Sequence, residues 1–438
     1  ASPSGQANWI LNLPVTETIE DLAGAVKKET HSFYDDPGFA GGNAGVVSKG
    51  NLSLVRKAID PGAGSWIAAQ RMRYDAFGNP IEILDPLGTA PGEPHSRSIT
   101  YDDEIHTHPV SETVHIGGAV ESVSMGAAYD VGLGVMTSST DFNGHETRYG
   151  FDPFGRIASI VKPGDSEQAS TEEYEYRLGM PLSGGRTINW IETRARESAG
   201  GGTVDSRMFF DGLTRKIMRR AEGEEPAQIV VTDTVVFNDR RTEWKTYLPY
   251  FETGTLDFAD PTFATPFQEK HYDALGRVLR LYQPDTGNGR PFAETTYEPL
   301  AWLQHDEEQT RAASPHFGAG FRYVEDGLRN DDGKGRLRVV EEIVKVDDEG
   351  NFIAQPQTWT TRYSYDVLDN FEGYLDSQGN TKTFLYDGLS RKFFMQDPDR
   401  GAYWWAYDDA GNVVRTCDAR NQHLAYTYDG ANRILAEW

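Results

Sequence analysis

Large side chains near the C-terminus alternate with a period of two. In the stretch Tyr403–Tyr407, Tyr403, Trp405 and Tyr407 fall on one face, and Trp404 and Ala406 fall on the other. A period of two is typical of a β-strand, because successive side chains of a strand point to opposite faces. The pattern therefore predicts strands of about six residues that are joined by tight turns.

This strand pattern recurs every 21 residues between position 363 and the C-terminus. Each copy has an aromatic residue, a Tyr-Asp pair two residues later, and Asn or Arg five residues after the tyrosine. In three of the copies a second Asp follows the tyrosine by eleven residues. The positions of this motif are Tyr365, Asp366, Asp376, Tyr386, Asp387, Asp397, Tyr407, Asp408, Asp418, Tyr428 and Asp429.

The same unit recurs upstream with more variation, and its residue types are those of turns. Asp is favoured at the first place of a type I turn and Gly at the fourth, while Pro at the second place fixes φ. We therefore assign these residues to turn closure and to the strand end before it, and to no catalytic role. The upstream motif residues are Tyr74, Asp75, Gly78, Asp85, Pro86, Gly88, Tyr129, Asp130, Phe151, Asp152, Gly155, Tyr272, Asp273 and Gly276.

Strands joined by such short turns are expected to be antiparallel neighbours in one continuous sheet. Stacking at a fixed period is expected to set like residues side by side, with Tyr363, Phe384, Trp405 and Tyr426 as an aromatic ladder. Cross-strand aromatic pairs contribute roughly 0.2–1 kcal/mol each. One repeat cannot bury its own face, so the array is stable only as a continuous sheet.

The motif Tyr-Asp-x-x-Gly-Arg/Asn followed by Asp-Pro-x-Gly resembles the RHS/YD repeat. The order of regular and divergent copies is similar to that in bacterial insecticidal toxin-complex proteins and other polymorphic toxins, and teneurins share the repeat. The resemblance implies an all-β fold, a long antiparallel sheet that spirals into a hollow shell around a C-terminal toxin. Many members cut themselves at an aspartate in a core motif after the last repeat. That motif is not found here, because Asp397–Gly401 is an ordinary inter-strand turn.

The spacing of clear and divergent copies predicts the organisation of the chain. We expect lead-in strands at 1–60, YD repeats at 61–165, a divergent β segment at 166–265, one repeat at 266–300, a second divergent segment at 301–360 and regular repeats at 361–438. Only Thr18–Glu29 and Leu303–Ala313 are candidates for short helices. The next turn aspartate is due just after Trp438, so we expect one continuous shell that goes on in a longer parent protein.

Composition narrows the class of protein further. The chain of 438 residues carries 42 Lys and Arg against 67 Asp and Glu, a net charge of −25. Such an acidic surface argues against binding to nucleic acid or to anionic lipid. A single cysteine, Cys417, rules out an internal disulfide. Aromatic residues at 12% and 45 glycines fit an all-β protein.

Three features suggest chemistry, and each also has a plainer interpretation. His106, His108 and His115 are a possible start of a metal site, or are exposed strand residues. The acidic turns Asp331–Gly335 and Asp347–Asn351 are possible calcium loops, but they lack the spaced ligand order of such loops. Trp404 and Trp405 are a possible sugar platform or part of the wall. We predict no catalytic residue, no metal and no cofactor.

The favoured hypothesis is a non-catalytic structural shell that encapsulates and helps to deliver a toxin or other cargo polypeptide. Its expected partners are that cargo and further shell or secretion-complex components, with no nucleic acid and no membrane insertion. The expected location is secreted or extracellular, from a bacterium. One alternative is a secreted or cell-surface adhesion module that binds glycans, and another is a glycan-active enzyme on a β scaffold.

Overall fold

The computed structural model describes residues 10, 12–41, 47–118, 121–198, 201–262, 264–285, 287, 289–326, 335–347 and 349–438. In this part of the chain there are 33 strands, in two antiparallel sheets of 17 and 16 strands, and a single 3-10 turn at Ser183–Gly185. The prediction of an all-β, antiparallel fold is confirmed. No helix in the described part is long and apolar enough to cross a membrane.

The chain divides into two compact units. Unit 1 comprises Ala1–Glu146 and Arg362–Trp438, and unit 2 comprises Thr147–Thr361. The domain ranges predicted from the sequence stay predictions.

The strands of unit 1 are β1 (Thr16–Glu20), β2 (Val26–Tyr34), β3 (Leu52–Asp60), β4 (Ser65–Tyr74), β5 (Pro80–Leu84), β6 (Ser96–Tyr101), β7 (Pro109–His115), β8 (Ser122–Asp130), β9 (Val135–Thr140), β27 (Phe371–Leu375), β28 (Thr381–Tyr386), β29 (Lys392–Asp397), β30 (Gly401–Tyr407), β31 (Val413–Cys417), β32 (His423–Tyr428) and β33 (Ile434–Glu437).

The strands of unit 2, of which the first and last reach the boundary with unit 1, are β10 (Glu146–Phe151), β11 (Ile157–Val161), β12 (Glu172–Pro181), β13 (Thr187–Arg196), β14 (Thr203–Phe210), β15 (Lys216–Glu222), β16 (Gln228–Thr232), β17 (Val235–Phe237), β18 (Glu243–Tyr247), β19 (Tyr250–Thr253), β20 (Phe267–Tyr272), β21 (Val278–Tyr282), β22 (Phe292–Glu298), β23 (Ala301–His305), β24 (Gly320–Glu325), β25 (Leu337–Val346) and β26 (Phe352–Tyr365).

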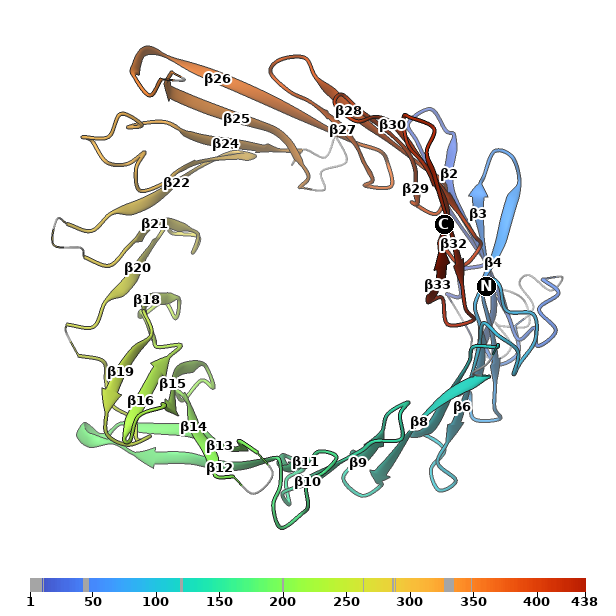
Figure 1. Cartoon of the computed structure of the whole chain (residues 1–438), viewed down its shortest axis with the longest axis horizontal. Coiled ribbons are helices and arrows are strands. Elements are labelled where there is room, and N and C mark those ends of the chain that lie inside the picture. Colours follow the sequence, from blue (N-terminus) through green and yellow to red (C-terminus); the bar gives the residue numbers. More distant parts are fainter. Residues whose placement is uncertain are drawn as a thin grey trace. The chain divides into compact units, whose positions relative to one another are not determined.

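Unit 1 is built from two meanders in which each strand pairs with the next along the chain. One runs from β1 to β9 and the other from β27 to β33. The strands near the C-terminus lie beside β2, β3 and β4 (Figure 1), and backbone hydrogen bonds join the two meanders. Two stretches of the chain that are about 300 residues apart therefore form two layers of one unit.

In the described part of unit 2 the chain changes sheet three times: after β16, between β18 and β19, and after β19. Strands β10 to β16 pair in order, and β16 then pairs with β19. The chain leaves this sheet at Asp233, whose φ is +55°, and β17 starts the second sheet by pairing with β18. The second sheet continues through β20 to β25, again in sequence order.

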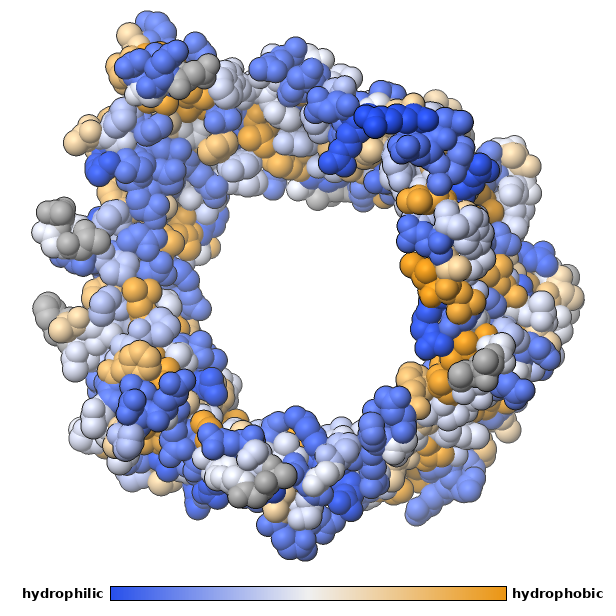
Figure 2. All heavy atoms as spheres, in the orientation of Figure 1, coloured by the Kyte–Doolittle hydropathy of each residue, from blue (hydrophilic) through white to orange (hydrophobic). Residues whose placement is uncertain are grey.

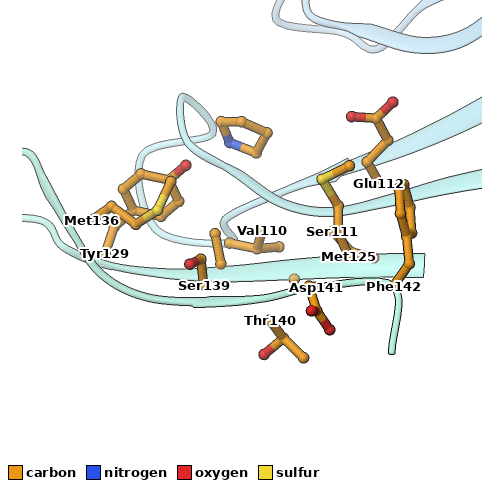
Figure 3. Close-up of a pocket in the computed structure, with 13 residues that line it drawn as sticks. Val110, Ser111, Glu112, Met125, Tyr129, Met136, Ser139, Thr140, Asp141 and Phe142 are labelled. Atoms are coloured by element: carbon orange, nitrogen blue, oxygen red, sulfur yellow. The ribbon is translucent and has the colours of Figure 1, made fainter. Parts of the chain in front are cut away.

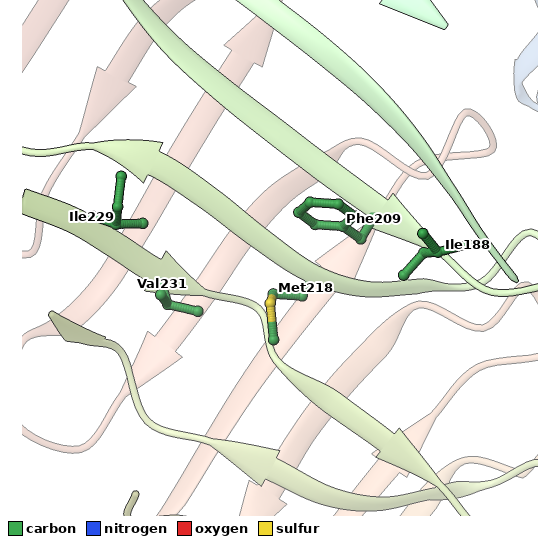
Figure 4. Packing of buried hydrophobic residues seen from close by; sticks show 5 residues of the cluster. All are labelled: Ile188, Phe209, Met218, Ile229 and Val231. Atoms are coloured by element: carbon green, nitrogen blue, oxygen red, sulfur yellow. The ribbon is translucent and has the colours of Figure 1, made fainter. Parts of the chain in front are cut away.

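The hydrophobic core of unit 2 lies on one face of β13 to β16. Five buried side chains from neighbouring strands pack together there (Figure 4), and Leu256 and Phe258 from the loop after β19 cover them. The rings of Phe209 and Phe258 meet edge to face at 5.4 Å. The five residues are Ile188, Phe209, Met218, Ile229 and Val231.

A charged row continues this face where the apolar core ends. Glu192, only 5% exposed, accepts bonds from Arg194 at 2.8 Å and Arg207 at 2.5 Å. Asp257, from the covering loop, binds Arg207 at 2.6 Å, and Glu252 binds buried Arg220 at 2.8 Å. A buried charge is costly unless it is paired, so these ion pairs are what let the loop close over the sheet.

Both predicted helices are wrong. Thr18–Glu29 spans the end of β1, a turn and the start of β2, and Leu303–Ala313 begins inside β23 and continues as turns. The turn at Asp21 explains the first error. Its carboxylate accepts bonds from the Ala23 and Ala25 backbone N–H groups at 2.9 Å each, which closes a β1–β2 hairpin.

Candidate functional site

The motif aspartate closes each repeat turn with its own side chain. In the first clear copy, Asp75 Oδ1 accepts bonds from the backbone N–H groups of Phe77 at 2.8 Å and Asn79 at 2.9 Å, and Oδ2 accepts one from Asn79 Nδ2 at 2.9 Å. An arginine at the same place as Asn79 binds in the same way, as Arg156 Nε does to Asp152 at 2.7 Å. The same arrangement recurs at Asp211, Asp273, Asp366, Asp387, Asp408 and Asp429.

The fourth residue of the turn adopts a left-handed conformation. Gly78, Gly155 and Gly276 have φ of +94°, +74° and +84° there, and Ser390 and Asn432 take the same place with φ near +60°. The strand register shifts just before this turn, for example between Ala406 and Tyr407. A type I turn followed by a left-handed residue and a bulge is a common hairpin connection. Glycine fits this place because it has no Cβ.

The motif tyrosine joins one repeat to the one before it. The hydroxyl of Tyr386 donates to the Phe371 carbonyl oxygen at 3.0 Å, and that of Tyr407 to Lys392 at 2.7 Å. Tyr428 donates to Val413 at 2.8 Å, and Tyr74 and Tyr272 make equivalent bonds to Leu52 and Glu243. Burial raises the pKa of Tyr74, Tyr386 and Tyr407.

Aspartate also closes the second turn of the repeat at Asp85, Asp376, Asp397 and Asp418. Asp85 Oδ1 accepts bonds from the Leu87 and Gly88 N–H groups, with Pro86 between them, and the ring of His95 binds Oδ2 at 2.9 Å. Asp376 and Asp418 each accept two backbone N–H bonds. The Lys382 ammonium at 2.7 Å, together with the backbone N–H groups of Arg400 and Asp399, lowers the pKa of Asp397 to about 2.

Three predicted motif residues depart from this pattern. Asp130 accepts one bond from the Leu133 N–H, and the Gly134 N–H turns to the Asp130 backbone oxygen at 2.8 Å. Tyr129 stacks on His108 with ring centroids 4.5 Å apart. Phe151 lacks the hydroxyl that would join neighbouring repeats.

The predicted aromatic ladder is wrong in its spacing. Because each repeat contributes two strands, equivalent residues of successive repeats lie two strands apart, with another strand between them. Phe371 fills the gap between Tyr363 and Phe384, at 6.0 and 5.5 Å from their centroids. The Lys392 ammonium fills the next gap, at 5.2 Å from Phe384 and 4.5 Å from Trp405.

Two repeat turns of the C-terminal meander dock on the backbone of the N-terminal meander. The Gly388 N–H donates to the Ile59 carbonyl oxygen at 2.7 Å, and the Gly430 N–H donates to Ile116 at 2.9 Å. Asn432 Nδ2 donates to Asp85 Oδ2 at 3.2 Å. A Cβ on Gly430 would lie 2.4 Å from the Ile116 oxygen, and one on Gly388 2.7 Å from the Ala58 oxygen. We call this contact the layer seam.

An apolar pocket of about 420 Å³ opens on the strands β7, β8 and β9 of unit 1. Met125, Met136 and Phe142 stand around it (Figure 3), and each is at least 36% exposed. Gly126 and Ala127 line the pocket and add little side-chain volume to it. Glu112 also lines it, and its carboxylate accepts a hydrogen bond from Arg97 at 3.0 Å. The pocket offers an apolar contact surface.

Further exposed apolar side chains gather over the strands nearest the C-terminus, as the orange patches of Figure 2 show. Leu424, Ile434, Leu435 and Trp438 are 40 to 67% exposed. These residues belong to β32 and β33 or follow them directly.

The interpretation of His106 and His108 as strand residues is wrong. His106 and His108 lie in the β6–β7 turn, where their N–H groups bind the Asp102 carboxylate, and the His106 ring stacks on Phe77 at 4.0 Å. His115 lies in β7 and binds Ser98. Across the described residues, no group of three or more His, Cys, Asp or Glu side chains is placed to hold a metal ion.

The two acidic turns lie partly outside the described residues, at 331–334 and at 348. In the described part, Asp347 binds Asn351 as a repeat-type aspartate does, at 2.7 and 3.2 Å. Cys417 is a strand residue of β31, half-buried, and Trp404 and Trp405 lie in β30.

Sequence reasoning missed several aspartate turns and the layer seam. Asp21, Asp102 and Asp141 close turns with their carboxylates. The signal for Asp141 was present, because it lies eleven residues from both Asp130 and Asp152. The seam had a weaker signal, a glycine directly after the motif aspartate at Gly388 and Gly430, 42 residues apart.

Comparison with known proteins agrees with this picture of an all-β protein made of Tyr-Asp hairpins. Residues 407–437 match the RHS repeat family. No curated protein matches the sequence. The chain therefore contains RHS repeats, and the predicted resemblance is confirmed.

Solved structures that contain TcdB2 and TccC3, or a Tc holotoxin pore, have a similar fold. The crystal structure of TcdB2-TccC3-Cdc42 aligns with a TM-score of 0.74 and 13% identity, over 94% of this chain and 26% of that one. TcdB2-TccC3 aligns with a TM-score of 0.74 and 15% identity, over 94% and 24%. A Photorhabdus luminescens Tc holotoxin pore aligns with a TM-score of 0.71 and 12% identity, over 94% and 26%. This chain spans about a quarter of the chains it matches, and the likeness shows the fold.

Proposed function

We propose that this chain is a section of the wall of an RHS shell, and that the shell encloses and helps to deliver a toxin or other polypeptide. The observation that carries the proposal is the fold likeness to TcdB2-TccC3 over 94% of the chain. The role is structural: the motif residues close turns and join strands, and the same turn chemistry recurs in copies far apart along the chain.

The contacts of unit 1 support a wall. Tyrosine hydroxyls join each repeat to the preceding one, and the layer seam joins two meanders that are far apart in sequence. The net charge of −25 favours a cargo with basic segments, since opposite charge steers association. The exposed apolar pocket at Met125 and Met136 suits contact with apolar side chains of a cargo that is not folded. We infer a secreted or extracellular location for the assembled protein.

The test is denaturing intact-mass spectrometry on the natural polypeptide that carries this sequence, purified natively. We expect a second polypeptide that is released only on denaturation and that resists added protease until then. A single polypeptide with no retained companion would overturn enclosure, and it would favour an exposed binding module.

A further inference from the structure

A polar pocket of about 300 Å³ lies at the layer seam, beside the bond between Gly388 and Ile59. Strands β2, β3 and β4 form its floor, and the repeat turns at 388–391 and 409–411 form its other side. Among the described residues, four of the hydrogen-bonding side chains that line it have no other partner. They are Lys28, Thr30, Lys57 and Ser390.

The strand register places three of these groups on one face of the sheet. Thr30 of β2 lies directly opposite Lys57 of β3, and Lys28 precedes Thr30 by two residues. Diagonal neighbours of this kind are roughly 7–8 Å apart at the backbone, within reach of long side chains. Lys57 is in turn opposite Ile67, whose buried side chain forms the apolar part of the floor. Both ammonium groups can therefore approach one ligand over Thr30.

Neither lysine is paired within the part of the chain that the structure describes. Within the described ranges, no carboxylate lies within 4.0 Å of the Lys28 or Lys57 ammonium, and the Thr30 and Ser390 hydroxyls make no hydrogen bond. Lys27, one residue from Lys28, pairs with Asp21 at 3.3 Å. Glu17 of β1 lies opposite Thr30 on this face, and within the described residues no ion pair joins it to either lysine. Two neighbouring cations without a direct ion pair are unexpected in a chain with 67 acidic and 42 basic residues.

The other charged groups at the pocket leave this positive site intact. The Arg391 guanidinium is already bound to Asp387 at 2.7 Å and to the Asp408 carbonyl oxygen at 2.8 Å. The Asp409 carboxylate also lines the pocket, but it is exposed and more than 4.0 Å from both ammonium groups. The pocket thus offers two cations and two hydroxyls to one negatively charged ligand.

We propose that this pocket binds a tetrahedral oxyanion, a phosphate or sulfate group, between Lys28 and Lys57. The hydroxyls of Thr30 and Ser390 donate to its oxygens, and lysine binds such groups as a point charge. Ser390 belongs to the C-terminal meander and the other three groups to the N-terminal one, so the bound anion would bridge the layer seam. This inference does not depend on the enclosure of a cargo.

The test is thermal unfolding of the full chain in inorganic phosphate, in sulfate and in chloride at matched pH and ionic strength. Matching is needed because salt alone screens surface charge. At a phosphate concentration ten times the dissociation constant, we expect the midpoint to rise by about 1–3 °C over chloride. The phosphorus NMR line of inorganic phosphate should broaden in the presence of the protein.

Matched variants assign the effect to the pocket. K28Q/K57Q should lose both the shift and the line broadening, whereas K27Q/K162Q, with the same change of charge at two lysines that are already paired, should keep them. In chloride, K28Q/K57Q should unfold at the same temperature or higher, because one repulsion has been removed. Loss of the phosphate response then cannot be a folding defect.

Further ligands decide the class of the anion. If phosphoserine stabilises the chain as well as or better than inorganic phosphate, the proposal is supported. The natural ligand would then be a phosphate ester group of a larger molecule. An equal effect of acetate would overturn it, because a carboxylate would then serve as well. An equal phosphate response in K28Q/K57Q and in the unchanged chain would also overturn it.

Discussion

An aspartate at the start of a turn can fold its carboxylate back over the turn and accept backbone N–H bonds that strands would leave unmade. Asp75, Asp273 and Asp376 do this with one oxygen, while the other oxygen binds Asn or Arg at the end of the turn. Arginine and asparagine alternate at this place because either can supply one side-chain donor. The repeat therefore preserves the hydrogen bonds that the aspartate makes within the turn. It accepts either asparagine or arginine at the end of the turn because both make the same bond.

The turn aspartates predict a dependence of stability on pH. The pKa of Asp397 is lowered from 3.8 to about 2, and hydrogen bonds from Asn380 and Arg277 lower the pKa values of Asp376 and Asp273. A lowered pKa means that the stability is present above pH 4 and is lost as the pH falls from about 4 to about 2. The midpoint of thermal unfolding should fall across that range.

The variant D397N tests this assignment. It should be less stable than the unchanged chain at pH 7, and its midpoint should change less between pH 4 and pH 2.5. D239N is the control, since Asp239 is an exposed turn residue. An unchanged pH profile in D397N would contradict the role of Asp397.

A second prediction concerns the hydroxyl group of the motif tyrosine and its effect on the free energy of unfolding. Removing it in Y407F leaves the Lys392 carbonyl oxygen without this partner, at a cost of about 1 kcal/mol in the free energy of unfolding. Y403F is the matched control, because Tyr403 lies in the same strand and packs on Trp405 at 4.6 Å. Urea unfolding should separate the two variants, and equal losses would argue against the inter-repeat bond.

At the scale of the element, the layer seam depends on a glycine at the second place of the turn. Gly388 and Gly430 have it and dock, whereas the turn between them has Asp409 at that place. Gly388 and Gly430 are two repeats apart, so alternate motif turns donate a backbone hydrogen bond to the N-terminal meander. Glycine is required at these two places because a Cβ would contact backbone oxygens of the other meander. A left-handed backbone is not the reason, because neither glycine has a positive φ.

A methyl group at this place should open the seam. G430A puts a Cβ 2.4 Å from the Ile116 oxygen, so the turn must withdraw and its N–H bond is lost, at about 1–3 kcal/mol. Hydrogen exchange at the residue 430 amide should become faster. G212A is the control, because Gly212 also follows a motif aspartate but has nothing within 4 Å. Equal effects of the two substitutions would contradict the seam.

The sequence predicted the strands and turns well because both depend on local chemistry. Tyr-Asp spacing, alternation and turn residues act within one hairpin, and they led to the antiparallel fold and the RHS resemblance. Contacts between distant segments have no such local signal, so Gly388 on Ile59 and the pairing of β16 with β19 were not predicted. The helix expected at Thr18–Glu29 failed because the Asp21 turn was not recognised as a repeat-type turn.

At the scale of the whole molecule, charge is the property that no single contact explains. The net charge of −25 stays although many arginines are paired with carboxylates, as Arg207 is with Glu192 and Asp257. An excess of like charge favours solubility and opposes compaction, because the surface repels itself. Salt weakens both the local ion pairs, which stabilise the fold, and the overall repulsion, which destabilises it. Its effects on stability through these two interactions therefore have opposite signs.

The repulsion predicts that salt stabilises this protein. Raising sodium chloride from 20 to 200 mM shortens the range of exposed charges from about 20 Å to about 7 Å, which screens the excess acid more than the half-buried ion pairs. We expect the midpoint of thermal unfolding to rise over this range, with the steepest change at low salt. A midpoint that fell with salt would mean that the ion pairs of the surface contribute more than its self-repulsion. The paired residues Arg186 and Asp260, both exposed and 2.6 Å apart, would then be the first pair to remove.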